Sequence, residues 1–530
     1  MGHPNGCPEQ KKVYLCGMFV RKKNNPSGIV SVQIIDKSNG KYKVVKTIGS
    51  SSLSDEISIL YGQGKKWITA HCGQRDMFAV TQQEQEEKHV TEHLLSNIEN
   101  ILLDGAQQIL DRVFRLTGFD AIEDDVLKQL VTSRLCQPMS KAATVDYLKF
   151  HFDEDVELHK IYRYLDKLNS TQKEIVQQIS VAHTRKILGG KIGLVFYDVT
   201  TLYFETDYDD DLRKQGFSKE GKHSKPQIVL GLLVSSGGYP LAYSIHEGNK
   251  YEGHTMLPIV EDFVKKFELK DFVIVADSGL LNKDNIKSLE ENGYKYIIGA
   301  RIKKETSTIQ SWILAQNKTD GSFYEYPKTK TSRLIVGYSE QRAKKDTHNR
   351  NKGIKRLEKT YQTPTVTKSK INKRGYNKFL ELSDDVNVKI NYDKIAEDQK
   401  WDGFKGYITN TKLPAKMVYQ EYSELWQIER AFRITKGTLE LRPIFHFTPK
   451  RIEAHVCICF VAYKVYKEME RILKSRGVNL SVDKALNIAK TIVTLKIKLP
   501  LSGETMNKTM ILARHKPVAR LFDEEFWEFF

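Results

Sequence analysis

The sequence predicts an α/β protein in which a mixed sheet is flanked by helices. Three apolar runs, GLVFYDVTTLYF, QIVLGLLVSS and YPLAYSIHE, follow one another from residue 193 and predict a meander of three strands, with Gly237 and Gly238 in the second turn. Two helical segments, GHTMLPIVEDFVKKF and NIKSLEENG, then alternate with two further strands, DFVIVADSGL and YKYIIGARI. The order β-β-β-α-β-α-β is typical of a mixed sheet with helices on its faces.

The N-terminal part predicts a small β module followed by a polar connection. Residues 13–48 alternate between apolar and polar side chains, and Asn39-Gly40 is a strong hairpin signal. Residues 82–100 are rich in Gln and Glu and predict a solvated helix or a linker. We therefore assign residues 1–100 to an N-terminal β module and linker.

Residues 101–188 predict a helical domain. Ser140 follows Pro138 and is a candidate N-cap. In the segment LHKIYRYLDKL, three cationic residues share one helical face, namely Lys160, Arg163 and Lys167. Several short helices with a basic face suit a DNA-binding domain, although an ordinary solvated helix has the same pattern.

The charge of the chain indicates a polyanionic partner. The 83 Lys and Arg residues exceed the 66 Asp and Glu residues by 17, and a basic protein without such a partner is the alternative. Nucleic acid is favoured over a membrane, because no apolar run approaches the roughly 20 residues that span a bilayer. The N-terminal sequence MGHPNGCPEQKK has no apolar core of a secretory signal. Six scattered cysteines argue against a disulfide framework, and we expect a cytoplasmic, nucleoid-associated protein.

A basic segment interrupts the predicted sheet domain. Between residues 342 and 378 there are 13 Lys and Arg residues against two acidic residues, Asp346 and Glu358. Such a block predicts a nucleic-acid contact surface or a disordered tether. We favour a folded insertion, because YEYPKTKTSRLIVGY and WDGFKGYITN on its two sides have strand patterns. The expected boundaries are 189–303 for the first part of the sheet domain, 304–412 for a β-rich basic insertion, 413–472 for the second part of the sheet domain, and 473–530 for a C-terminal tail suited to dimerisation.

Three carboxylates occupy positions that the surrounding pattern reserves for apolar residues. Asp198 lies inside a run of β-forming residues, where an ionised carboxylate is a poor neighbour, and Asp277 ends another apolar strand. A helix is predicted between Pro414 and Gly437. At 100° per residue, Glu429 falls in the middle of a stripe that is otherwise apolar up to its last member. The other members of this stripe are Val418, Tyr422, Leu425, Phe432 and Lys436.

These acids predict a metal site if they meet. Clustered carboxylates repel one another unless a cation neutralises them, and an oxygen-only set suits Mg²⁺ or Mn²⁺. Two such ions about 3.5–4 Å apart can activate a water or a 3′-hydroxyl and stabilise the leaving oxygen of a phosphodiester. Each acid alone also has a structural explanation: an exposed strand end for Asp198, a turn cap for Asp277, or a pair with Lys436 or Arg433 for Glu429. The combination of all three with a basic chain favours a polynucleotidyl phosphotransferase.

The sequence resembles the DDE-type bacterial insertion-sequence transposases whose third carboxylate lies in a Y-x2-R-x3-E-x6-K signature. Tyr422, Glu429 and Lys436 match this signature, and Leu425 occupies its arginine position. The context also matches: FYDVTT, then VIVADSGLLN, then a long insertion, then LWQIERAFRITKGTLELRPIFH. The likeness extends over about residues 190–465.

This resemblance implies an RNase H-like core in which Asp198, Asp277 and Glu429 are catalytic and hold the two Mg²⁺ or Mn²⁺ ions. It implies cleavage at the ends of the element, which carry terminal inverted repeats, and strand transfer into target DNA by a homodimer in a synaptic complex. Tyr422 and Lys436 are the expected phosphate contacts, and Arg430 or Arg433 are the candidates to replace the missing arginine. An aromatic residue that stacks on a flipped base is also expected in such enzymes, and Trp312 and Trp401 are the candidates.

Two other functions fit parts of the sequence. Asp198-Val-Thr-Thr after an apolar strand is also typical of aspartyl-nucleophile phosphohydrolases, with Asp277 and Asp284 as the later acidic pair. That interpretation leaves Glu429 and the basic insertion unexplained. The other alternative is a catalytically idle DNA-binding regulator. His455, Cys457 and Cys459 lie in an apolar segment, and we expect them to pack in a core rather than to bind zinc.

Overall fold

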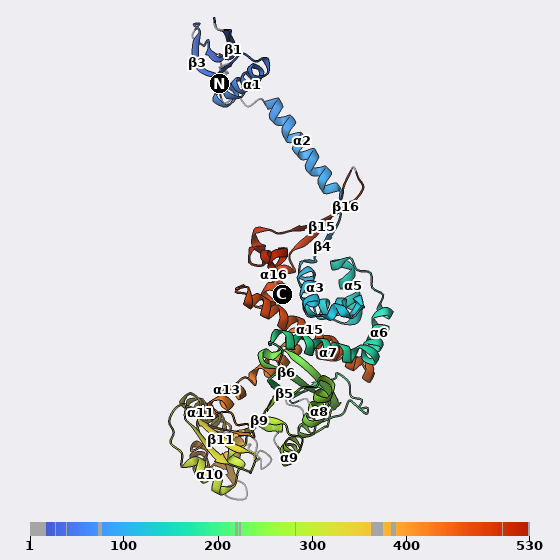
Figure 1. Ribbon diagram of the computed structural model, residues 1–530, viewed down its shortest axis with the longest axis vertical. Coiled ribbons are helices and arrows are strands. Elements are labelled where there is room, and N and C mark those ends of the chain that lie inside the picture. The colour runs from blue at the N-terminus through green and yellow to red at the C-terminus, as the bar shows by residue number, and fades with distance from the viewer. Residues whose placement is uncertain are drawn as a thin grey trace, which may run out of the picture. The chain divides into compact units, whose positions relative to one another are not determined.

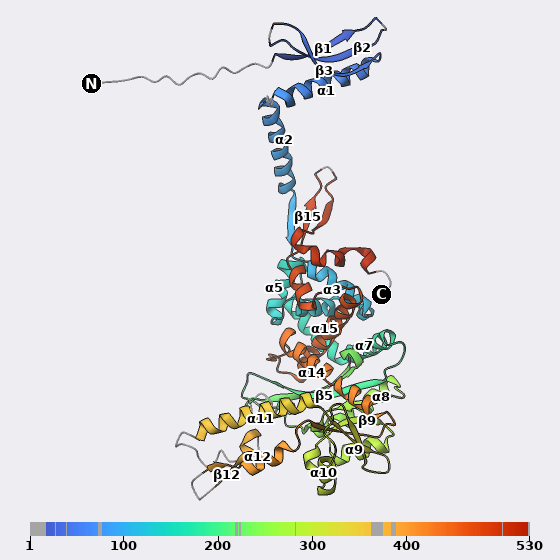
Figure 2. The same cartoon turned by 90° about the vertical axis from the view of Figure 1, so that its left-hand side faces the viewer.

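The computed structural model describes residues 17–527 except 27, 39, 73–76, 218–220, 222–223, 281, 362–374, 383–387 and 501. The chain divides into two compact units, shown in two views in Figures 1 and 2. The first unit comprises residues 1–100 and 496–506, and the second comprises residues 101–495 and 507–530.

The first unit begins with an antiparallel sheet of three strands, β1 (Met18–Asn24), β2 (Val30–Asp36) and β3 (Lys43–Ser51), in the order β1-β2-β3. Helix α1 (Ser54–Cys72) packs against all three strands. Gly64 makes this approach close, because a Cβ there would lie 2.9 Å from a methyl group of Val20. The predicted β module is confirmed, whereas α1 was not predicted, and Asn39 lies outside the described residues. Helix α2 (Met77–Ser96) covers most of the polar segment expected as a helix or linker.

Helices of the second unit pack around one long helix. This helix is α15 (Pro449–Ser475), whose side chains are mostly buried, and His455, Cys457 and Cys459 lie in the core as expected. Ser140 caps α5 as predicted, since its side chain accepts a hydrogen bond from the Ala143 amide (3.2 Å). The helices before the large sheet are α3 (Gly105–Leu116), α4 (Asp125–Cys136), α5 (Lys141–Phe152), α6 (Leu158–Lys167) and α7 (Lys173–Ile187). Of these, α3, α4, α6 and α7 contact α15 directly.

The large sheet has eight strands in the order β10-β11-β14-β9-β8-β5-β6-β7. Its first five strands in sequence are β5 (Leu194–Tyr203), β6 (Gln227–Ser235), β7 (Pro240–Glu247), β8 (Val273–Ala276) and β9 (Lys295–Ala300). Strands β5, β8 and β9 run parallel, and β6 and β7 continue from β5 as an antiparallel meander. Helix α8 (Met256–Phe267) connects β7 to β8, and α9 (Lys283–Glu291) connects β8 to β9. This topology confirms the predicted mixed, RNase H-like sheet.

The basic insertion extends the same sheet. Its strands β10 (Phe323–Pro327), β11 (Arg333–Tyr338) and β14 (Phe404–Thr409) pair antiparallel and join the sheet through β9. Both strand predictions beside the basic block are therefore confirmed. The block itself contains the long helix α11 (Glu340–Tyr361), which Figure 2 shows clearly. The remaining elements of the insertion are α10 (Ser307–Leu314), β12 (Leu380–Leu382), β13 (Val388–Ile390) and α12 (Tyr392–Gln399).

The two faces of the sheet are buried in separate cores. Phe196 and Leu202 of β5 face one core together with α13 (Ala415–Ser423), α14 (Trp426–Arg433) and α15. Tyr197 and Val199 face the other core together with α8. After α15 come α16 (Val482–Ala489), β15 (Val493–Lys498) and β16 (Thr505–Met510), and the two strands form a sheet in the order β16-β15-β4 with β4 (Ile98–Leu102). Among the described helices, none is both long and apolar enough to span a membrane.

Candidate active site

The two predicted aspartates occupy neighbouring positions on adjacent parallel strands. The β5–β8 register ends with Tyr197 opposite Ala276, and Asp198 and Asp277 are the next residues on the two chains. Adjacent strands are spaced about 4.8 Å apart. Tyr197 and Ala276 pack in the α8 core, and successive side chains alternate between faces, so both aspartates are directed to the α14 face. Asp198 is half-buried and Asp277 is exposed.

Glu429 lies on α14, which packs on the same face of the sheet. Ile428, Ala431 and Phe432 of α14 are buried in the core that also contains Phe196 of β5, and α14 contacts β5 and β6 directly. Glu429 itself is exposed. The helix that carries the third acid is therefore anchored beside the strand that carries the first.

The prediction of one continuous helix with Glu429 on its buried stripe is wrong. The segment forms two helices, α13 and α14, which are separated at Glu424 and Leu425. Backbone bonds here span three residues, from the Leu425 amide to the Tyr422 carbonyl (3.0 Å) and from the Gln427 amide to the Glu424 carbonyl (2.9 Å). Tighter winding changes the rotational phase of the next helix, so Glu429 leaves the buried stripe. A π-helical turn, Ile434–Thr438, follows α14 and contains Lys436.

Tyr422 connects the third-acid segment to Asp277. Its hydroxyl donates a hydrogen bond to Asp277 Oδ1 (3.1 Å), and the ring is buried. Gly299 of β9 provides the space, because a Cβ at this position would lie 2.5 Å from the Tyr422 hydroxyl oxygen. Burial, and secondarily the charge of Asp277, raises the pKa of the Tyr422 hydroxyl, which keeps the phenol protonated and able to donate.

Lys405 brings a cation to the same place from the insertion. Its Nζ lies 4.4 Å from the centroid of the Tyr422 ring, a cation–π distance. Burial lowers the pKa of Lys405, whereas the charges of Asp277 and Glu429 both oppose this decrease. Asp277 and Glu429 therefore lie within electrostatic range of one lysine. Sequence reasoning missed Lys405, and the available signal was a lysine between Phe404 and Tyr407 in an otherwise apolar strand.

A cavity of about 670 Å³ opens beside Asp277. Its walls come both from the core strands and from the insertion, and Trp401 is one of the wall residues, whereas Trp312 packs against Tyr326. Cations dominate the lining, although Asp346, Asp398 and Asp402 also contribute. The cationic lining residues are Arg301, Lys303, Lys304, Arg342, Arg350, Lys378 and Lys405. A cavity of this character, next to a carboxylate, suits a phosphate-bearing ligand.

The donor chemistry of the three acids fits a hard divalent cation. Asp198, Asp277 and Glu429 offer only carboxylate oxygens, which Mg²⁺ and Mn²⁺ prefer. As positioned, the described residues contain no group of three or more His, Cys, Asp or Glu side chains close enough to hold an ion. The backbone brings the acids to one face of the sheet, and the side chains do not form a closed ligand set.

The other predicted contact residues lie around α14. Arg430 donates a hydrogen bond to Glu470 of α15 and forms an ion pair with it. Arg433 is exposed and Lys436 is half-buried. Leu425, at the signature's arginine position, is buried in the core. Asp284, the alternative acid, lies in the first turn of α9.

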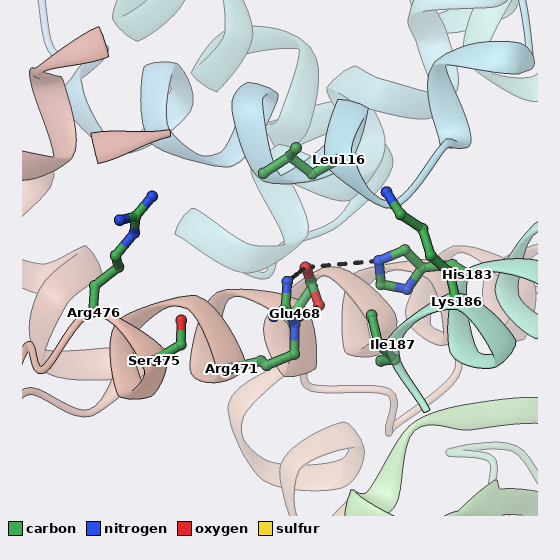
Figure 3. Close-up of a pocket in the computed structure, with 8 residues that line it drawn as sticks. All are labelled: Leu116, His183, Lys186, Ile187, Glu468, Arg471, Ser475 and Arg476. Carbon is green, nitrogen blue, oxygen red and sulfur yellow. Dashed lines mark hydrogen bonds and ion pairs between the residues drawn. The ribbon is translucent and has the colours of Figure 1, made fainter. Parts of the chain in front are cut away.

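A second cavity, of about 420 Å³, lies where α7 meets α15 (Figure 3). Glu468 is 1% exposed and accepts hydrogen bonds from Arg471 Nε (2.9 Å) and Nη2 (2.6 Å). His183 Nε2 lies 3.6 Å from the same carboxylate. Burial alone would raise the pKa of Glu468, but the bonds from Arg471 and His183 outweigh it and lower the pKa to about 2. The charges of this cluster compensate one another, which is typical of a structural ion-pair network.

The order and directions of its central strands give this chain an RNase H-like sheet, and a cavity lined mainly by cations lies beside it. The comparison with protein families gives the particular family: the model described as "Transposase DDE domain" matches residues 189–464, just over half of the chain, and the chain belongs to this family. The protein is therefore a transposase, an enzyme that acts on DNA.

Comparisons with individual proteins add little to this assignment. A search of curated proteins gave no match. Among solved structures, the chain is similar to one described as "Cryo-EM structure of piggyBac transposase synaptic complex with hairpin DNA", with 10% sequence identity and a TM-score of 0.38. The similarity covers 73% of this chain and 78% of that chain.

Proposed function

We propose that this transposase binds the terminal inverted repeats of an insertion sequence, and that it cuts and joins DNA with Asp198, Asp277 and Glu429 as a metal-binding triad. The observation that carries the proposal is the register of the sheet. Asp198 and Asp277 follow the last β5–β8 pair on adjacent parallel strands, and α14, which carries Glu429, packs on the face to which they are directed. This arrangement supports a shared role for three acids that are separated by 79 and 152 residues in sequence.

In this proposal, the metal ions and the protein side chains have different roles in the reaction. Mg²⁺ or Mn²⁺, bound as a pair, would activate the attacking water or 3′-hydroxyl and stabilise the leaving oxygen. Tyr422 orients the Asp277 carboxylate through its hydrogen bond. Lys405 and Arg342 give the adjacent cavity a positive potential that attracts DNA phosphates. Lys436 and Arg433 are the further phosphate contacts, and Arg430 would join them only by leaving Glu470.

One structural feature supports the wider role. The basic face predicted in the helical region is exposed in α6, where Lys160, Arg163 and Lys167 point away from the buried Ile161 and Leu165. We assign terminal-repeat binding to residues 101–188 on this basis. Synapsis of two element ends requires two protomers, and we assign dimerisation to residues 473–530.

Cleavage of a defined substrate tests the proposal. The full chain is incubated with duplex DNA that carries the inverted repeats flanking its gene, in either Mg²⁺ or Ca²⁺. We expect binding in both and cleavage only in Mg²⁺. Asp198→Ala, Asp277→Ala and Glu429→Gln should each reduce cleavage by about 10³-fold or more and leave binding intact. Glu291→Gln, an exposed acid on α9, is the matched control and should cut at the normal rate.

Two outcomes would contradict the proposal. Normal cleavage by all three variants would show that the acids are not the triad. Hydrolysis of a small phosphomonoester that depends on Asp198 but not on Glu429 would instead support the aspartyl-nucleophile phosphohydrolase.

A further inference from the structure

Helix α11 of the insertion has two chemically different faces. Its buried face includes Arg350, Gly353 and Leu357, at spacings of three and four residues. The opposite face is exposed and basic over the second half of the helix. It consists of His348, Lys352, Lys355, Arg356 and Lys359, which line a shallow hollow of about 360 Å³.

The buried face fixes the orientation of the helix. Arg350 is 4% exposed and makes a two-pronged hydrogen bond to Asp402, with its Nη1 2.6 Å and its Nη2 2.5 Å from the carboxylate oxygens. Thr347 donates to the same carboxylate (2.9 Å). Gly353 lies against the Tyr376 ring, because a Cβ at this position would be 2.4 Å from the ring atoms. A buried ionic anchor of this kind stabilises one rotational setting, so the exposed face is held rather than freely turning.

Three lysines of the exposed face carry charge that no described acid neutralises. Among the described residues, no salt bridge is formed by Lys352, Lys355 or Lys359. Glu358, the nearest acid on the helix, is half-buried and accepts a hydrogen bond from Tyr392 (3.3 Å) instead. Uncompensated lysines in a row repel one another, and a polyanion would remove this repulsion.

We infer that His348, Lys352, Lys355 and Lys359 form a phosphate-binding stripe for duplex DNA that flanks the cleavage site. The inference rests on the proposed function and adds the surface that holds the substrate outside the active site. The first half of the same helix supports it, because Arg342, Asp346, Asn349 and Arg350 line the cavity that opens at Asp277. The stripe lies on the other face of the helix from these residues, so it can contact only DNA that runs outside the cavity.

The dimensions of the stripe fit a DNA strand. His348 and Lys359 are eleven residues apart, which corresponds to about 16 Å along a helix. Backbone phosphates advance about 3.4 Å along the duplex axis per nucleotide, so the stripe spans about five of them. Lysine contacts to phosphates position DNA without reading its sequence, and we expect this surface to bind flanking DNA of any sequence.

The salt dependence of binding tests this inference. In the full chain, Lys352→Gln, Lys355→Gln and Lys359→Gln are combined, and the affinity for repeat-containing duplex is measured in Ca²⁺ between 50 and about 300 mM salt. Each lost phosphate contact lowers the slope of log K against log salt by about 0.9, so the slope should fall by about 2 to 3. Affinity near 100 mM salt should fall at least about tenfold, equally for scrambled flanking sequences.

A matched control separates this effect from net charge. Lys265→Gln, Lys270→Gln and Lys287→Gln are combined to remove the same charge from exposed lysines. These residues lie in α8, in the loop after α8 and in α9, respectively, and both helices lie away from α11 in both views (Figures 1 and 2). This control should change the slope by less than about 1. Circular dichroism and thermal unfolding of both triple variants verify that they fold.

The outcomes distinguish this inference from the proposed function. If the wild-type chain binds no duplex DNA, the proposed function fails. Suppose that the wild type binds DNA and that the slope of log K against log salt is unchanged in both triple variants, or falls by the same amount in both. The stripe is then not a DNA contact, and the proposed function stands. A loss of affinity for duplex RNA without a loss for duplex DNA would also overturn the inference.

Discussion

The second unit contains two groups of acidic residues that the fold treats in opposite ways. On α15, Glu468 is fully buried and bonded by Arg471, and Glu470 pairs with Arg430 and Lys467. In the candidate active site, Asp277 and Glu429 are exposed, and neither forms a salt bridge with another described residue. The α15 acids are neutralised by the protein's own cations, whereas Asp277 accepts a hydrogen bond from the neutral Tyr422 hydroxyl. Acids kept accessible in this way are able to take an external cation.

Among the variants that test this difference between the two groups of acids, the largest loss of stability is expected at Glu468. Replacing the buried Glu468 with Gln leaves the half-buried guanidinium of Arg471 without its counter-charge, and the free energy of unfolding should fall by about 2–4 kcal/mol. Because the folded pKa is about 2, the contribution of this carboxylate is present above its unfolded pKa of about 4.5 and is lost as the pH falls towards 2. Urea unfolding at pH 7 and pH 3 measures both effects.

Glu429→Gln is the paired variant for this experiment. An exposed, unpaired acid contributes little, so the free energy of unfolding should change by less than about 0.5 kcal/mol. An equal loss of stability in both variants would mean that Glu429 belongs to a structural network, and the distinction between the two groups would fail.

The sequence was informative where a single local pattern decides the structure. Asp198 and Asp277 each interrupt an apolar run, and their place on neighbouring strands follows from the strand order. The exposed position of Glu429 was not predictable in this way, because no Gly or Pro marks the break at Glu424 and Leu425. That break depends on how α13 and α14 pack against different strands of the sheet.

The basic insertion shows a second limit of sequence reasoning. Its charge is equally compatible with a tether and with a folded helix. The residue that anchors α11 is Arg350, and its partner Asp402 lies 52 residues further along the chain. A pair at this separation leaves no periodic signal. Lys405 was missed for the same reason, since only the pairing of β14 with β9 brings it to Tyr422.

A further effect on stability is expected from Lys464, a buried cation of α15. Its Nζ donates hydrogen bonds to the Ser180 carbonyl (2.9 Å) and to Thr184, and burial lowers its pKa to about 7. The unfolded chain retains this proton up to about pH 10, so between pH 7 and 10 it binds more protons than the folded chain. Stability should therefore rise with pH in this range, by up to about 1.4 kcal/mol per pH unit for this lysine.

Lys464→Met removes this proton and should reduce the rise. Burial also lowers the pKa of Lys141 to about 7, so part of the pH dependence should remain. Chemical unfolding of wild type and variant at pH 7, 8 and 9 makes the comparison. Identical pH dependence in the two proteins would mean that Lys464 is not the titrating group.

The smallest effect is expected at the hydrogen bond between the Tyr422 hydroxyl and Asp277. Tyr422→Phe keeps the ring under Lys405 and removes only the hydrogen bond to Asp277. A net hydrogen bond to a charged group is worth about 1.5 kcal/mol, so the free energy of unfolding should fall by no more than about 1.5 kcal/mol. Cleavage should slow by about tenfold, and DNA affinity should stay near normal. Tyr419→Phe is the control, because this half-exposed ring packs against Phe323 instead. If Tyr422→Phe cuts at the wild-type rate, the hydroxyl does not orient Asp277 during the reaction. If Tyr419→Phe slows cleavage as much, the effect comes from aromatic packing of α13 and not from the hydrogen bond to Asp277. The hydrogen bond would then not support the difference between the active-site acids and the α15 acids.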